Sequence, residues 1–254
     1  MDQLGRKLEI CCFNLASALI AQESGAHRVE LCAGPAEGGT TPALGAIRLT
    51  RELLHIELYP IIRPRGGDFL FSEEEFRIMQ QDVVLCREAG CDGVVIGALR
   101  ADGTVDKDRV ARLVELAYPL GVTFHRAFDW TAEPYRALEE LIGIGCERIL
   151  TSGQRPLAAE GAELLHELVN LADGRIIIMP GSGLRAANIA ALAERTGASE
   201  FHSSARTLRA SAMTYANSAM AEDQSIVIAD KEEIQGMLGA LGALGAASSP
   251  TPAL

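Results

Sequence analysis

The sequence predicts an α/β fold in which parallel strands close into a TIM-like (β/α)8 barrel that forms a single domain. Short apolar strands alternate with amphipathic helices, and turns rich in glycine, proline and aspartate separate them. The pattern contains eight such strands, which is the number that closes this barrel. Polar side chains also gather where several strands end, at the functional end of such barrels. An open doubly wound sheet is the alternative.

The composition indicates an ordinary globular protein. The chain has 254 residues, of which 48% are hydrophobic and 22% are charged, so one domain can bury a sizeable core. A net charge of −11 argues against binding to nucleic acid or to an anionic membrane. No apolar run reaches the roughly 20 residues of a membrane-spanning helix, and no signal peptide is recognisable. We therefore expect a cytoplasmic protein, and no motif indicates a nucleotide cofactor.

The order of elements follows from the apolar periodicity and from helix-start signals. The expected strands are Leu8–Phe13, Arg28–Cys32, Ile56–Arg63, Gly93–Ile96, Val122–His125, Arg148–Thr151, Arg175–Met179 and Glu200–Ser203. The expected helices lie at about residues 14–25, 42–54, 72–89, 106–117, 133–143, 160–171 and 185–195. Thr41 before Pro42 predicts an N-cap with proline in the first turn, and Ser72 with Glu75 predicts a capping box.

The pattern weakens near the C-terminus. We assign residues 1–241 to the barrel and its C-terminal extension, which begins at about residue 208. Leu208–Ser225 has no clear period, whereas Asp230–Leu241 has the composition of one short helix. The last residues, 242–254, are rich in small residues and proline, and we expect them to form a disordered tail.

Alternation along the strands predicts which side chains point into the barrel. Apolar positions such as Ile10, Cys12, Val29 and Leu31 should face the helices. The inward positions are then Glu9, Cys11, Glu30, Cys32, Glu57, Tyr59, Arg63, Thr123, His125, Glu200 and His202. Since a buried carboxylate costs several kcal/mol unless it is paired, the glutamates need partners. Arg63, His125, His202 or a bound cation are the candidates, and a closed ion-pair network without a ligand is the alternative.

The segment Gly121–Asp129 is the centre of the predicted site. It is a short strand that ends in His125, Arg126 and Asp129. A strand needs no such polar cluster in order to fold, and ligand chemistry lies at this end of parallel strands.

A second group of residues predicts an anion or phosphate site. Gly181 and Gly183 follow strand seven and precede a helix, and a serine pair follows strand eight, where such barrels bind phosphate. The candidate anion-binding residues are Arg63, Arg65, Ser152, Gly181, Gly183, His202, Ser203, Ser204 and Ala205. Ordinary tight turns, together with a rigid loop of surface salt bridges around Arg63 and Arg65, are the alternative reading.

The six cysteines have no CxxC spacing, which excludes a zinc ribbon and a thioredoxin-type motif. We expect reduced thiols, with Cys86, Cys91 and Cys146 as packing residues.

Several motifs together resemble the copper homeostasis protein CutC family. They are LEICCFN (8–14), RVELCAGPAEGGTTPALG (28–45), PIIRPRGGDF (60–69), VTFHRAFD (122–129), RILTSGQ (148–154), IIMPGSG (177–183) and EFHSSA (200–205). The resemblance runs in order from about residue 8 to 217. It implies a TIM-like barrel, a cytoplasmic location, a homodimer or higher homo-oligomer, and a role in copper(I) binding or tolerance. It also points to Cys11 and Cys32 as copper ligands, the same cysteines that the strand alternation directs inward.

Three hypotheses for the site remain open. Soft thiolates of Cys11 and Cys32 suit Cu(I). The chain is alternatively a lyase, isomerase or hydrolase acting on a small phosphorylated or carboxylated substrate, with Glu30 and His125 as acid and base and Asp129 as an orienting group. A divalent cation held by Glu30, His125, Asp129 and His202 is the third. The expected partner is accordingly a copper ion or a small anionic molecule.

Overall fold

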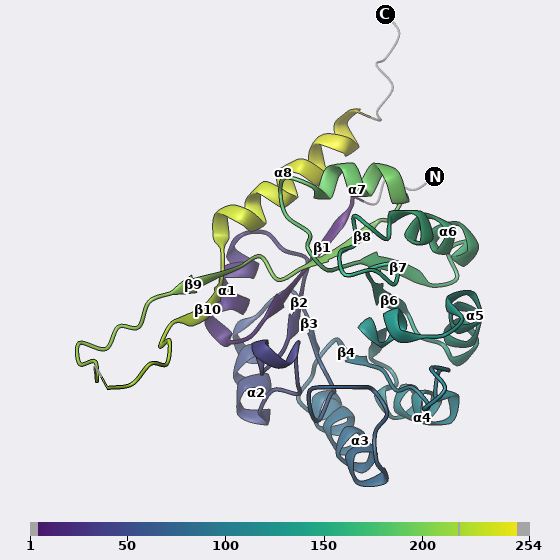
Figure 1. Ribbon diagram of the computed structural model, residues 1–254, viewed down its shortest axis with the longest axis horizontal. Coiled ribbons are helices and arrows are strands. Elements are labelled where there is room, and N and C mark those ends of the chain that lie inside the picture. The colour runs from purple at the N-terminus through teal and green to yellow at the C-terminus, as the bar shows by residue number, and fades with distance from the viewer. Residues whose placement is uncertain (1–4, 218, 248–254) are drawn as a thin grey trace, which may run out of the picture.

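A computed structural model describes residues 5–217 and 219–247 and shows a ring of strands surrounded by helices (Figure 1). The ring strands are β1 (Lys7–Cys12), β2 (Arg28–Leu31), β3 (Glu57–Pro60), β4 (Gly93–Ile96), β5 (Gly121–Phe124), β6 (Arg148–Thr151), β7 (Ile177–Pro180) and β8 (Glu200–Ser203). The outer helices are α1 (Leu15–Glu23), α2 (Leu44–Leu53), α3 (Glu73–Glu88), α4 (Lys107–Ala117), α5 (Pro134–Ile144), α6 (Ala162–Ala172) and α7 (Ile189–Thr196). The 3-10 helices η1 (Pro35–Glu37) and η2 (Arg126–Trp130) follow β2 and β5.

The strand pairing closes the barrel. Hydrogen bonds join the parallel strands in the orders β3-β2-β1-β8 and β4-β5-β6-β7. A parallel bridge between Ile61 and Val95 continues the ring from β3 to β4, where the Ile62 N–H donates to the Val95 carbonyl at 2.8 Å. Strand β7 lies beside β8 and completes the circle. The prediction of a (β/α)8 barrel is therefore confirmed, and the alternative of an open sheet is wrong.

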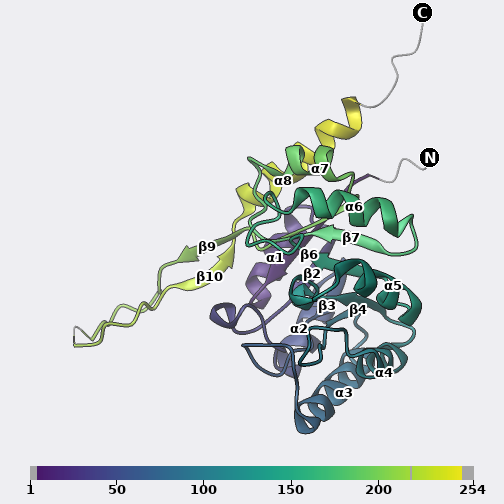
Figure 2. The same cartoon turned by 45° about the vertical axis from the view of Figure 1, so that its right-hand side comes forward.

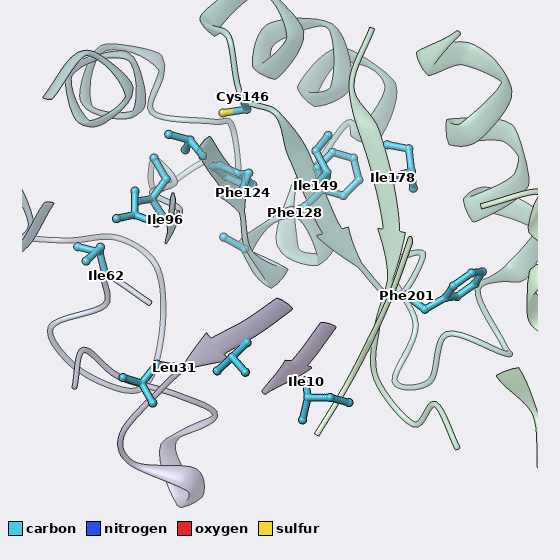
Figure 3. Close-up of a cluster of buried hydrophobic side chains, with 14 of the residues drawn as sticks. Ile10, Leu31, Ile62, Ile96, Phe124, Phe128, Cys146, Ile149, Ile178 and Phe201 are labelled. Atoms are coloured by element: carbon cyan, nitrogen blue, oxygen red, sulfur yellow. The ribbon is translucent and has the colours of Figure 1, made fainter. Parts of the chain in front are cut away.

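The main core lies between the strands and the helices. Figure 3 shows this cluster, with side chains of Ile10, Leu31, Ile62, Ile96, Phe124, Phe128, Cys146, Ile149, Ile178 and Phe201. Burying each large apolar side chain contributes roughly 1.5–3 kcal/mol, so this layer dominates the stability of the barrel. Cys12, Cys86 and Cys91 belong to the same cluster, as the sequence predicts for packing residues. Inside the ring a separate small cluster contains Cys11, Cys32, Tyr59, Ile61 and Val95, which confirms the predicted register.

The capping box of Ser72 and Glu75 is present at α3, as predicted. Two other helices begin later than predicted. Helix α2 begins at Leu44, because Thr41 is held by the segment that follows β3: its Oγ1 accepts from the Arg63 N–H at 2.9 Å and its own N–H donates to the Arg63 carbonyl. Helix α7 begins at Ile189, several residues beyond the glycine loop that was expected to lead directly into it.

The C-terminal extension contains an element that the sequence analysis missed. Strands β9 (Arg206–Arg209) and β10 (Ile226–Ala229) pair antiparallel and form a ribbon that projects from the barrel (Figures 1 and 2). Its base is attached to α1, where Asn14 Nδ2 donates to the Val227 carbonyl at 2.8 Å.

Helix α8 (Lys231–Ala247) follows the ribbon and is longer than expected. Gly242–Ala247 is helical, so this part of the predicted tail was wrong; Leu241 and Leu244 pack against the core and extend the helix. Residues 248–254 lie outside the described part of the chain. Within that described part, no helix has both the length and the apolar character to cross a membrane.

Candidate metal and ligand site at the mouth of the barrel

A layer of paired charged side chains, the ionic layer, fills the barrel interior at the amino ends of the strands. Arg28 and Arg148 are each 1% exposed, and both guanidinium groups donate to the Glu200 carboxylate at 2.7 Å. Arg28 also pairs with Glu9, and it donates to Glu57 at 3.1 Å. Although burial opposes ionisation, the Arg28 guanidinium holds the pKa of Glu9 well below its usual range. Of the predicted partners, His202 does contact Glu9, whereas Arg63 and His125 form no ion pair with these glutamates within the described residues. Two inward arginines, which the prediction did not include, supply the other contacts.

Tyr59 separates this ionic layer from the upper barrel. Its ring lies 5.1 Å from the Arg28 guanidinium, and its hydroxyl donates to Glu147 at 3.0 Å. The opposite wall makes room for the ring, since a Cβ at Gly93 or Gly121 would overlap its atoms. The polar groups of the functional end are therefore held above a filled floor.

Two thiols meet above this floor. Strands β1 and β2 place Cys11 opposite Glu30, and Cys32 follows at the end of β2. The Cys11 and Cys32 sulfurs are 3.5 Å apart, and a Glu30 oxygen lies within 4.8 Å of both. The hydrogen bond from Cys32 lowers the pKa of Cys11 to about 5, whereas burial raises the pKa of Cys32. At neutral pH the pair therefore consists of one thiolate and one thiol.

His202 connects the thiols to the ionic layer. Its Nδ1 lies 2.6 Å from Glu9 and its Nε2 lies 3.8 Å from Glu30. Burial alone would lower the pKa of His202, but its hydrogen bonds with Cys11 and Glu9 raise it well above the usual range. Burial raises the pKa of Glu30 as well, which favours the protonated form of this carboxyl. The Cys11 thiolate thus lies beside an imidazolium cation.

A cavity of about 330 Å³ opens above these groups. Cys11, Glu30 and His202 line its base. The side walls carry Arg63, Phe69 and His125 on one side and residues 182–185, Ser203 and Ser204 on the other. Among the predicted site residues, the lining therefore unites Cys11, Glu30, Arg63, His125, Gly183, His202, Ser203 and Ser204. Arg126, which the sequence placed in the central polar cluster, lines the cavity as well. Phe13, Phe69 and Arg185 also line it and were missed, because nothing in their spacing marks them.

Asp129 and Ser152 do not line the cavity. Helix η2 turns the Asp129 carboxylate toward the end of β6, where it accepts from the Ser152 N–H and hydroxyl, each at 2.9 Å. The carboxylate also accepts from Thr151 Oγ1 and from Arg126 Nε, the latter at 2.8 Å. Its hydrogen-bonding capacity is used within the loop, so a catalytic role for Asp129 has no support in the geometry.

Arg65, Gly181 and Ala205 also lie outside the lining. Arg65 Nε donates to Glu75 at 2.6 Å, and its guanidinium stacks over Phe71. A Cβ at Gly181 would overlap Leu150, so this glycine permits close packing beneath the cavity. Ala205 is fully buried with φ +40°. These residues support the loops around the cavity, and their predicted contacts with a ligand stay a prediction.

The predicted divalent-cation site does not assemble. Asp129 is bound in its loop, as described, and His125 is not among the groups that converge on Glu30. Within residues 5–217 and 219–247, the metal-ligating groups that cluster in threes are Cys11, Glu30 and Cys32. Two sulfurs and a protonated carboxyl favour a soft ion over Mg²⁺ or Mn²⁺.

The fold and the site define a (β/α)8 barrel protein with a buried pair of thiols at the carboxyl ends of its first two strands. The CutC family model matches residues 6–207, and the chain belongs to the CutC family. A CutC family protein from Chromobacterium violaceum is 56% identical over 215 residues, covering 85% of this chain and 86% of the relative. The copper homeostasis protein cutC homolog of Homo sapiens is 45% identical, covering 87% and 81% of the two chains.

Solved structures agree with this assignment. The CutC structure from Streptococcus agalactiae matches with a TM-score of 0.76 and 32% identity, covering 78% of this chain and 98% of that one. Phosphoribosylanthranilate isomerase from Thermotoga maritima matches with a TM-score of 0.58 at 13% identity, covering 94% and 99% of the two chains. The second likeness concerns the barrel fold alone.

Proposed function

We propose that this protein acts in copper homeostasis by binding Cu(I) through the Cys11 and Cys32 thiolates. The observation that carries the proposal is the 3.5 Å separation of the two buried sulfurs, which allows one ion to contact both. Soft thiolates favour Cu(I) over the harder divalent cations. Relatives from mouse and human, 46% and 45% identical, carry the name copper homeostasis protein, which agrees with this choice of metal.

The charges around the thiols favour a monovalent ion. Cys11 is already ionised at neutral pH, so binding requires only the Cys32 proton to leave. A Cu(I) ion between two thiolates carries a net charge of −1, and the adjacent His202 imidazolium balances it. Burial favours the protonated form of Glu30, which weakens this carboxyl as a metal ligand.

Titration of the reduced protein with Cu(I), against a coloured competing chelator, tests the proposal. We expect about one tightly bound Cu(I) per chain, and loss of that binding in both Cys11→Ser and Cys32→Ser, because an alcohol oxygen is a hard ligand. Cys146→Ser is the matched control, since Cys146 is also buried but lies in the outer core. Unchanged affinity in Cys32→Ser would refute the assignment.

We further expect a cytoplasmic location and a homo-oligomer. Free thiols persist in a reducing compartment, and all six cysteines are unbridged. Light scattering coupled to gel filtration measures the oligomeric state. The enzyme hypothesis is not favoured, because Asp129 is used within its own loop and the named relatives are copper homeostasis proteins.

A further inference from the structure

Two buried polar atoms in the cavity wall have no hydrogen-bond partner among the residues that the structure describes. They are Nε of Arg63 and Nε2 of His125. Arg63 is 5% exposed and His125 is 3% exposed, and both side chains line the cavity. Leaving a buried donor unpaired costs about 1–3 kcal/mol, so two such atoms on side chains that line one cavity indicate a ligand that accepts from them.

The tautomer of His125 makes its free nitrogen a donor. Its Nδ1 accepts from the Ala127 N–H at 3.1 Å, at the start of η2, and therefore carries no proton. In the neutral ring the proton is then on Nε2. Burial and the positive charge of Arg63 lower the pKa of His125 to about 3, which keeps the ring neutral. His125 thus offers one fixed N–H to the cavity and has no free lone pair there.

Arg63 brings a positive charge that forms no close ion pair within the described residues. Its Nη1 donates to the carbonyls of Glu37 and Gly39 at 2.8 and 2.9 Å, and its Nη2 donates to the Gly67 carbonyl at 2.6 Å. No carboxylate in the described part of the chain lies within 4.0 Å of its guanidinium nitrogens. The negative charges of Glu37 and Asp68 act on Arg63 only from beyond this distance, so an anion bound in the cavity would be its first close counter-ion.

Phe69 fixes both donors in place. Its ring centroid lies 4.9 Å from that of His125 and 4.9 Å from the Arg63 guanidinium carbon. The loop carbonyls already restrain the Arg63 guanidinium, and the ring of His125 packs where a Cβ at Gly97 would overlap it. Because both groups are already ordered, binding a ligand costs little conformational entropy.

The opposite wall also suits an anion. Gly183, Leu184 and Ser204 line the cavity. Their backbone N–H groups donate no hydrogen bond to any described residue. Arg185 and Arg206 lie beside them and form no ion pair with any described carboxylate. Although the whole chain has a net charge of −11, the mouth of this cavity is therefore positive.

We propose that this cavity binds a small molecule through an oxyanionic group, a carboxylate or a phosphate, whose oxygens accept hydrogen bonds from His125 Nε2 and Arg63 Nε. The volume of about 330 Å³ accommodates a molecule of metabolite size. The ligand lies over the Cys11 side of the thiol pair, because Cys11 lines the same cavity.

Calorimetric titration with inorganic phosphate and, separately, with malonate tests the proposal on the reduced protein. Binding of either probe is expected, and the tighter one identifies the oxyanionic group. Arg63→Met removes the charged donor, and His125→Asn removes the Nε2 donor while keeping a residue that caps η2. Each variant should bind the preferred probe about tenfold or more weakly, equivalent to about 1.4 kcal/mol.

Arg65→Met is the matched control, since Arg65 lies two residues away but pairs with Glu75 outside the cavity. It should bind the preferred probe like the wild type. Nitrogen NMR of the wild-type imidazole gives a second measurement that needs no variant. We expect a protonated Nε2 whose signal moves when the probe is added. Absence of binding by both probes, equal affinity in Arg63→Met and His125→Asn, or an unmoved His125 signal would each overturn the proposal.

Discussion

Replacing Arg28 by methionine tests the ionic layer that supports the site. Arg28 is almost fully buried and holds three carboxylates, those of Glu9, Glu57 and Glu200. Methionine fills a similar volume but removes every one of these hydrogen bonds. The carboxylates then depend on their remaining neighbours, and the loss of stability should follow from how well each is still paired.

The structure sets the magnitude of this effect. Glu200 keeps Arg148 at 2.7 Å, and the side chain of Glu57 is 42% exposed, so neither suffers greatly. Glu9 is 1% exposed, and among the described residues its remaining hydrogen-bond partner is His202. Removing one partner of a buried pair costs about 3–5 kcal/mol, and the compensation at Glu200 places the expected loss near the lower limit, at about 3 kcal/mol.

The loss should depend on pH in a defined direction. The folded pKa of Glu9 is depressed, so its contribution is fully present above the unfolded pKa of about 4.3 and is lost as the pH falls through the folded pKa. The difference between wild type and Arg28→Met should therefore be largest at neutral pH and shrink in acid. Urea unfolding of both proteins, at neutral pH and in acid, measures this difference in the free energy of unfolding. Arg175→Met is the control, because its pair with Glu139 is solvent-exposed and should matter little. An equal loss in the two variants, or a loss that does not change with pH, would refute this reasoning.

Two further predictions concern the mouth of the barrel. Gly97→Ala places a Cβ against the His125 ring and should destabilise the fold by about 1–3 kcal/mol, measured by thermal unfolding; an unchanged melting temperature would contradict the close packing. The thiolate of Cys11 should react with a small alkylating reagent at a rate that rises through pH values near 5 and is flat at neutral pH. Cys146, whose pKa burial raises to about 12, should stay unreactive across that range, and a rate that still climbs above neutral pH would show that Cys11 is an ordinary thiol.

Alternation along the strands carried most of what could be predicted about the interior. Because side chains on a strand alternate between its faces, the outward positions of Ile10 and Leu31 implied that Cys11 and Glu30 point inward. Arg28 obeys the same rule but was overlooked, since an arginine at the start of a strand resembles a surface residue. Its burial depends on Glu9 and Glu200, which other strands supply, and such a tertiary pairing has no local signature.

Other features depended on contacts between distant segments. The position of the Asp129 carboxylate depends on hydrogen bonds from the loop after β6, which lies more than twenty residues further along the chain. The ribbon β9–β10 has four exposed residues in its first strand, so burial imposed no alternation that could reveal it. Arg63 was correctly placed at the mouth, but its role as an unpaired charge follows from loop carbonyls that only the folded chain brings together.

X-ray absorption at the copper edge, on reduced protein loaded with Cu(I), identifies the atoms that bind the copper ion. We expect a first coordination shell of sulfur from Cys11 and Cys32, preserved in Cys146→Ser and lost in Cys32→Ser. A shell of nitrogen or oxygen atoms in the wild type, or sulfur coordination that survives in Cys32→Ser, would contradict it.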